Sequence, residues 1–468
     1  MWAELSGLTR ASAALWWRFL PRLLLWFWLG YAVHALCVQS AAAFGADAKV
    51  TGNIFFGVAL IATGGGTLLM LHALGPGLTE FRRRLARFRR TPPSSPGETG
   101  PVPAIPTDVA AWRGGLDTVA VTIGPFLAIY SVWGMVGDEV LGLFVTNAKN
   151  YGTGSVDKWS IDLTDTRFYV LTAAAVWAVR LVVLAAARLV RRRRPAGDQG
   201  GTGAWVAFAG IVLEGLWVFL AFVVVGILAG NLREWLAGRV VTQWLLAQWV
   251  RLTDLLPDLI LFQIHLPDLV RSLVSWTWTT LLPAASHAVL LPLVWLALTA
   301  TVFGWRDLRL RDLVGLPVLR WTTGPLGPGR PMAGLGRLVK VATGDLRTKY
   351  LPVASSLRML LRGGPRFVGA YLVLATVLST TQELVEALVR VSIGPVDVDR
   401  WSQTQPFAGL LVGTVFTPVL VALYGAAFDR CLAMVPEDAV RVREQRLGQL
   451  TPGSGPRPGP GEGTGTRG

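Results

Sequence analysis

The sequence has few charged side chains for its length. Only 16% of its 468 residues are Asp, Glu, Lys or Arg, whereas 52% are hydrophobic. A water-soluble protein of this composition would expose a large apolar surface, so we expect lipid to surround much of the chain. Long apolar stretches with almost no internal charge follow one another, and each offers about the 20 residues that a transmembrane helix needs.

Cysteines and common catalytic motifs are also scarce. The two cysteines, Cys37 and Cys431, are too isolated for a disulfide framework or a thiolate metal site. The sequence contains no Gly-x-x-x-x-Gly-Lys-Ser/Thr loop, His-Glu-x-x-His, Gly-x-Ser-x-Gly or Cys-x-x-Cys. Four histidines lie in separate segments, which favours packing or interfacial roles over a metal cluster: His34, His72, His265 and His287. We therefore expect no metal, no cofactor and no catalytic residue, and an embedded enzyme is disfavoured.

The apolar stretches predict an all-α, polytopic transmembrane bundle of about eight spans. We place the spans near residues 22–44, 53–76, 116–138, 168–190, 204–230, 280–304, 366–390 and 407–430. An even number of spans puts both termini on one side of the membrane. Most of the 44 Lys and Arg residues fall in the segments on that side, which the positive-inside rule assigns to the cytoplasm. The net charge of +15 therefore reflects topology in a multi-pass cell-membrane protein, and not nucleic-acid binding.

These spans divide the chain into six regions. The first three are a transmembrane hairpin with a basic cytoplasmic segment (1–90), a disordered Pro-rich linker (91–110) and spans three to six (111–304). The others are a basic cytoplasmic loop (305–365), the last transmembrane hairpin (366–434) and a cytoplasmic tail (435–468), disordered from about residue 447.

Two segments between spans have amphipathic helical patterns. Residues 231–278 carry five tryptophans among leucine-rich runs, which predicts helices lying on or partly in the outer leaflet, or alternatively an extra or re-entrant span. In the basic loop, a small amphipathic helix is predicted to bind anionic lipids at the cytoplasmic face. A docking surface for a partner subunit is the competing interpretation. Its apolar face and flanking arginines are Val353, Leu357, Leu360 and Leu361 with Arg358 and Arg362.

Arg180 and Glu214 are the ionisable residues nearest the centres of two predicted spans. Such residues cost roughly 2.5 to 3.5 kcal/mol each on insertion scales, so they are usually paired or functional. The two lie at similar depth on consecutive antiparallel spans, which predicts an ion pair. Glu214 would then be either a proton- or cation-responsive site with Arg180 as its counter-charge, or half of a structural clasp.

Two further sets of residues are weaker candidates. Four acids near the outer ends of the third and seventh spans predict either an acidic outer vestibule or solvated helix ends: Asp138, Glu139, Glu383 and Glu386. Gly64, Gly65 and Gly66 fall inside the second span. They favour either a helix break that exposes carbonyls to a substrate or close packing of a neighbouring helix.

These features favour transport or translocation. Spans 116–138 and 366–390 both contain a Phe-x-x-x-Tyr motif, at Phe126 to Tyr130 and Phe367 to Tyr371, as expected of a transporter built from repeats. The chain has few polar groups to replace water around a solute, so we expect an apolar or amphipathic cargo. The alternatives are a non-catalytic membrane subunit or scaffold of a cell-envelope complex, and a lipid-active enzyme. Expected partners are the bilayer and a membrane-protein or ATPase subunit.

Overall fold

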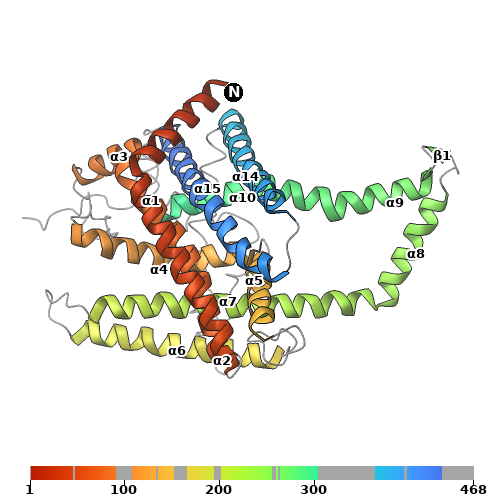
Figure 1. The fold of residues 1–468 in the computed structure, drawn as a ribbon, viewed down its shortest axis with the longest axis horizontal. Coiled ribbons are helices and arrows are strands. Elements are labelled where there is room, and N and C mark those ends of the chain that lie inside the picture. Colours follow the sequence, from red (N-terminus) through yellow and green to blue (C-terminus); the bar gives the residue numbers. More distant parts are fainter. Residues whose placement is uncertain are drawn as a thin grey trace, which may run out of the picture.

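The computed structural model describes ten ranges of the chain: residues 2–45, 48–90, 108–132, 135–151, 166–193, 202–255, 260–261, 264–303, 364–394 and 398–434. Helices dominate these ranges (Figure 1). The long helices are α1 (Trp2–Gly45), α2 (Lys49–Leu74), α4 (Asp108–Val132), α5 (Met135–Tyr151), α6 (Thr166–Arg193), α7 (Thr202–Ala237), α10 (Leu282–Val302), α14 (Pro365–Ile393) and α15 (Val398–Met434). Shorter elements are α3 (Thr79–Arg90), α8 (Val240–Asp254), α9 (Leu266–Trp276), a 3-10 turn (Gly75–Gly77), a π-helical turn (Thr277–Leu281) and two-residue strands β1 (Ile260–Leu261) and β2 (Ile264–His265).

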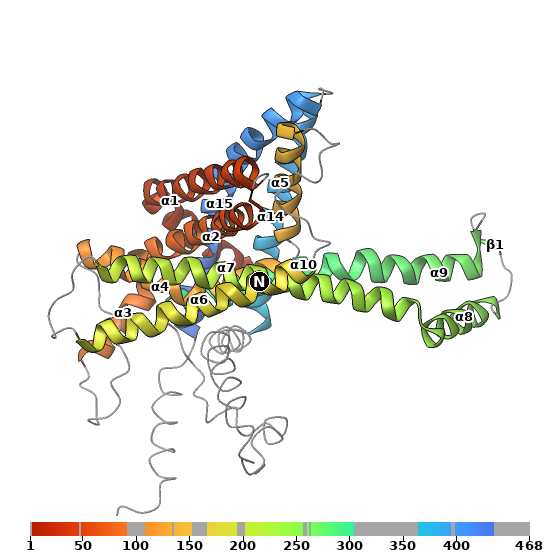
Figure 2. The ribbon, with the colours of Figure 1, turned by 90° about the horizontal axis from the view of Figure 1, so that it is seen from below.

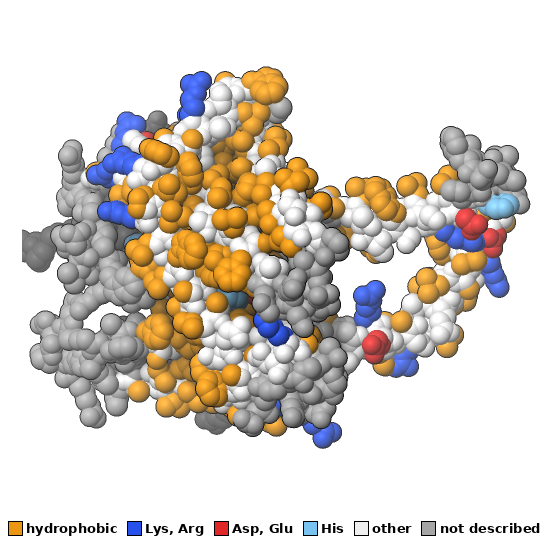
Figure 3. All heavy atoms as spheres, viewed as in Figure 1, with side chains coloured by type: hydrophobic (Ala, Val, Ile, Leu, Met, Phe, Trp, Pro, Cys, Tyr) orange, Lys and Arg blue, Asp and Glu red, His pale blue; other side chains and the backbone are white. Residues whose placement is uncertain are grey.

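The helices have the length and surface of membrane-spanning elements. In the described part of the chain, seven helices are long and apolar enough to cross a bilayer. The count rises to eight if the bent pair of α4 and α5 is taken as one further span. Large hydrophobic side chains cover the visible face of the bundle (Figure 3), and Leu36, Leu171 and Phe407 are about 70% exposed (69, 70 and 72%). Soluble monomeric proteins rarely expose so large an apolar surface to water. The chain is a multi-pass membrane protein, as its composition predicts.

Helices α1 and α2 form an antiparallel hairpin against which α15 packs. Small residues allow the two backbones to approach closely. A methyl group on Gly66 would lie 3.1 Å from the carbonyl oxygen of Trp26 and 3.2 Å from Cα of Gly30. Helix α2 runs from Lys49 to Leu74 and so includes Gly64, Gly65 and Gly66. Close packing against α1 offsets the low helix propensity of the glycines, and the intact helix leaves their carbonyls in its own hydrogen-bond ladder.

The third expected span is bent instead of straight. Residues 122–131 of α4 and 135–150 of α5 meet at an angle of 77°. Helix α5 extends well past the expected span end at residue 138 because an apolar face repeats at helical spacing. Val140 and Leu143 on this face are buried, whereas Leu141 on the opposite side is 62% exposed. Glu139, which directly precedes Val140 in the chain, is partly buried, whereas Asp138 is exposed.

The described residues between 231 and 278 form an arm that projects away from the bundle. Figures 1 and 2 show the end of α7 leading into α8, with β1, β2 and α9 returning toward α10. Arg271 of α9 joins the two sides near the tip: its Nε donates to the Thr253 hydroxyl at 2.8 Å, and its Nη2 lies 2.5 Å from Oδ1 of Asp254. Apart from β1 and β2, the described residues of this segment are mainly helical. Its position relative to a lipid leaflet stays a prediction.

The basic segment 79–90 is an amphipathic helix, α3, that is fixed to the end of α15. The carboxylate of Asp429 accepts hydrogen bonds from the backbone N–H groups of Phe81 (2.9 Å) and Glu80 (3.3 Å), and so caps the N-terminus of α3. The ring of Phe81 packs 5.1 Å from that of Phe303 and 6.2 Å from that of Phe428. The Pro-rich linker, the helix expected at 353–362 and the C-terminal tail lie outside the described residues.

Candidate functional site

Arg180 of α6 and Glu214 of α7 form a buried ion pair. Both Nε and Nη2 of Arg180 reach Oε2 of Glu214, at 2.6 and 2.5 Å. Each side chain is only 9% exposed. The indole ring of Trp217 lies 6.0 Å from the guanidinium carbon, and Gly124 of α4 leaves room for the carboxylate, because a methyl group there would lie 3.3 Å from Oε1. The two helices thus enclose a charge pair that neither could expose to lipid alone.

The chemistry of this pair is limited by its cationic partner. A guanidinium keeps its proton in proteins, so Arg180 holds a fixed positive charge beside Glu214. Its two short contacts reach the same carboxylate oxygen of Glu214. Such a pair resists separation of the two helices, which suits a clasp.

A second polar cluster joins α1, α2, α4 and α5. The Tyr130 hydroxyl donates to Oε1 of Glu139 at 3.0 Å, while Oε2 of Glu139 lies 3.4 Å from Nε2 of His34. On the other side of the ring, Nδ1 of His34 lies 3.0 Å from the Thr63 hydroxyl and 3.2 Å from the Ala59 carbonyl oxygen. We call these five residues the His34–Glu139 cluster. Its side chains are partly buried, with Glu139 at 23% and His34 at 16% exposure.

The four acids expected to ring an outer vestibule are not joined by any described contact. Asp138 is exposed beside Glu139, and Glu383 is exposed on α14. Glu386 pairs with Arg390 one turn along its own helix, at 3.6 Å. Among the described residues, no hydrogen bond or ion pair links either α14 acid to Glu139. Only Glu139 enters a polar cluster, because the bend between α4 and α5 carries it to α1.

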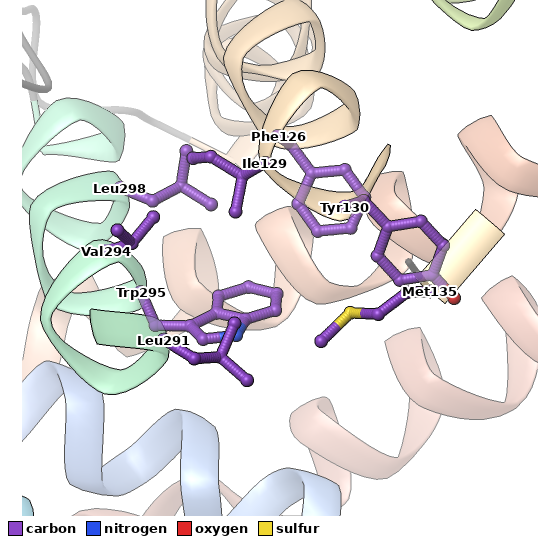
Figure 4. Close-up of a pocket in the computed structure, with 8 residues that line it drawn as sticks. All are labelled: Phe126, Ile129, Tyr130, Met135, Leu291, Val294, Trp295 and Leu298. Carbon is purple, nitrogen blue, oxygen red and sulfur yellow. The ribbon is translucent and has the colours of Figure 1, made fainter. Parts of the chain in front are cut away.

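An apolar cavity lies directly behind this cluster. The cavity is small, about 10 Å³, and it is lined from α4, α5 and α10. Figure 4 shows the lining side chains Phe126, Ile129, Tyr130, Met135, Leu291, Val294, Trp295 and Leu298, with the tyrosine hydroxyl pointing away from the others. The ring of Tyr130 therefore separates the cavity from Glu139, and one side chain belongs to both the apolar and the polar region.

The sequence pattern indicates Glu139 as a site candidate but not its partner His34. His34 lies near the centre of the first predicted span, 22–44, which is the same criterion that selects Arg180 and Glu214. The apolar spacing of Val136, Val140 and Leu143 could have shown that the helix continues beyond residue 138. Together these signals predict that His34 and Glu139 each lie within a helix of the bundle. They do not predict that the two side chains meet.

Comparisons with known proteins provide no further identification. No protein-family model matches the chain, and neither a curated protein nor a solved structure shows significant similarity to it. Among the side chains that the structure describes, no three His, Cys, Asp or Glu residues lie close enough to hold a metal ion.

Proposed function

We propose that this protein transports or translocates an apolar or amphipathic molecule across the membrane. The observation that carries the proposal is the bent α4–α5 span, which lies between an apolar cavity on one side and the His34–Glu139 cluster on the other. Broken spans at membrane depth are tolerated where they line a cavity or binding site, and transporters place their sites at such breaks.

The two surroundings of Tyr130 indicate the kind of cargo. Aromatic and aliphatic side chains offer dispersion contacts to a hydrocarbon group but no hydrogen bond that would retain a polar solute. One ring away, Glu139 and His34 can bind a polar or cationic head group. A molecule with an apolar body and a small polar end would use both regions at once.

Orientation follows from charge. The basic helix α3 and the N-terminal part of α1 lie at the same end of the bundle, where blue side chains gather in Figure 3. With the positive-inside rule, this end supports a cytoplasmic location in a cell membrane, where anionic lipids would contact Arg82 and Arg83. The chain has no nucleotide-binding loop, so transport would use an ion gradient or a separate ATPase subunit.

The first test is the identification of a bound molecule. Wild-type protein would be purified in mild detergent, and small molecules extracted from it would be identified by mass spectrometry. The same analysis would be made of Val294→Trp, which fills the cavity, and of Val373→Trp on the exposed face of α14, which is the matched control. We expect wild type and Val373→Trp to retain the same apolar or amphipathic molecule, and Val294→Trp to lose most of it. Equal retention in all three proteins, or none in wild type, would contradict a cargo site in this cavity.

A scaffold role is the second candidate, and the arm is the observation that favours it. Trp244, Leu246 and Trp278 on the arm are 57, 59 and 72% exposed on elements that project beyond the bundle. An apolar surface of this kind suits a membrane-protein partner or a leaflet. Co-purification of a stoichiometric protein partner that is lost when Trp244 and Leu246 are changed to serine, with no bound small molecule, would favour the scaffold role over transport.

A further inference from the structure

The contact between His34 and Glu139 joins two groups that can each gain or lose a proton. Histidine changes charge more readily near neutral pH than any other side chain, and a glutamate without a fixed cation beside it can be neutral or charged. The pair lies between helices α1 and α5 at 3.4 Å, longer than a strong charge-assisted hydrogen bond. Its state can therefore change without disrupting a tight clasp like that of Arg180.

The surroundings of His34 determine which ring nitrogen carries hydrogen. The Thr63 hydroxyl donates to the Ala59 carbonyl at 3.3 Å, which leaves its oxygen free to accept from Nδ1 at 3.0 Å. The Ala59 carbonyl oxygen, 3.2 Å from Nδ1, is also an acceptor only. The contact between Nδ1 and the carbonyl oxygen is therefore a hydrogen bond in the tautomer that carries hydrogen on Nδ1, and this tautomer is the basis of the inference.

With Nδ1 protonated, the approach of Nε2 to Glu139 requires one further proton. That proton lies on Nε2, giving an imidazolium beside a carboxylate, or on Glu139, giving a carboxylic acid beside a neutral ring. Without it, the lone pair of Nε2 would face a negative oxygen, and the two would repel. We infer that His34 and Glu139 form a binding site for one proton, and that this proton holds α5 against α1. Its release to water leaves a carboxylate and a neutral imidazole, which separate.

The groups around His34 and Glu139 come from five helices, and none of them is a described lysine or arginine paired with Glu139. From α4, the Tyr130 hydroxyl donates to Glu139, and Tyr31 on α1 lies one turn from His34, with ring centroids 6.5 Å apart. From α5, the exposed Asp138 adds a negative charge next to Glu139 in the chain. Helix α2 contributes the hydroxyl and carbonyl described above, and α15 the carbonyl that accepts from Tyr31.

A movement of α5 would change the shape of the apolar cavity, because Met135 at the start of α5 lines it. Tyr130, which also lines the cavity, donates a hydrogen bond to Glu139 of α5. The inference rests on the proposed transport function only for this coupling. Proton binding itself needs no cargo, and it is tested without one.

The test is a distance measurement between α1 and α5 as a function of pH. Spin labels would be placed at exposed Leu25 and Lys149 after both native cysteines, Cys37 and Cys431, are changed to alanine, and the protein reconstituted in phospholipid vesicles. Between about pH 5 and pH 8, where histidine titrates, we expect the distance to increase with pH by about 2 Å or more, the size of helix shifts at interfaces. A distance that does not change over this range overturns the inference.

Substitutions at the pair sharpen the result. Glu139→Gln should hold the short distance at every pH, because the amide can donate to Nε2 and cannot lose that hydrogen. His34→Leu should also abolish the response, whereas Glu383→Gln, an exposed acid on α14, should keep it. A pH response that survives in Glu139→Gln would show that another group is responsible. If the distance depends on pH but the protein binds no cargo, the proton site stands and the transport proposal fails. If cargo is bound but the distance does not change with pH, the transport proposal stands and the proton site fails.

Discussion

Two glutamates of the bundle have different surroundings. Glu214 belongs to the ion pair between α6 and α7, and Glu139 belongs to the His34–Glu139 cluster, where α5 meets α1. Glu214 is 9% exposed and meets a guanidinium through two contacts of 2.5 and 2.6 Å, whereas Glu139 is 23% exposed and meets an imidazole at 3.4 Å. Arginine keeps its charge and histidine does not. The two glutamates therefore differ in whether the charge of their partner is fixed, and on this difference we base the proposal that one helix contact is permanent and the other adjustable.

The largest effect is expected at the fixed pair. Arg180→Leu leaves Glu214 buried without its cation, and we expect a loss of about 3–5 kcal/mol in the free energy of unfolding. Denaturant unfolding of the purified protein in detergent would measure it. Changing Glu214 to leucine as well should restore most of the stability, because no charge then remains unpaired. If Arg180→Leu alone is as stable as wild type, the pair is not a clasp.

An intermediate effect is expected where α1 and α2 approach each other beside the cluster. In Gly66→Ala the new methyl group meets backbone atoms of Trp26 and Gly30 at 3.1 and 3.2 Å, so we expect a loss of about 1–3 kcal/mol. Gly65→Ala is the matched control. Its methyl group meets nothing within 4 Å, and the better helix propensity of alanine should leave stability equal or up to about 1 kcal/mol higher. Equal losses in both variants would contradict a close helix contact, and thermal unfolding distinguishes them.

The smallest of the three effects is expected within the cluster. Tyr130→Phe removes the hydrogen bond to Glu139 but keeps the ring that lines the cavity, so the unfolding free energy should fall by about 0.5–1.5 kcal/mol. Glu386→Gln, which breaks an exposed pair with Arg390, should cost less than about 0.5 kcal/mol under the same conditions. A loss in Tyr130→Phe as large as that in Arg180→Leu would remove the distinction between the adjustable and the fixed site.

The spans are largely predictable because hydrophobicity is a local property. The stretch expected at 53–76 lies within the apolar helix Lys49–Gly77, and the one at 407–430 within Pro406–Met434. Equal depth of Arg180 and Glu214 also follows from counting residues along two consecutive antiparallel helices. The bend between α4 and α5 does not follow, because it depends on how α5 packs against α1 and α15.

The sequence by itself determined that the protein is a helical bundle in a membrane, since composition and run length decide whether a segment prefers lipid or water. It also contained the side chains of both polar sites. Tertiary structure alone decided which of them meet. His34 and Glu139 lie far apart in the chain but meet where α5, at 77° to α4, contacts α1, and Asp429 reaches the N-terminus of α3 from 348 residues away. Contacts between distant helices depend on the packing of all their neighbours, which no local pattern specifies.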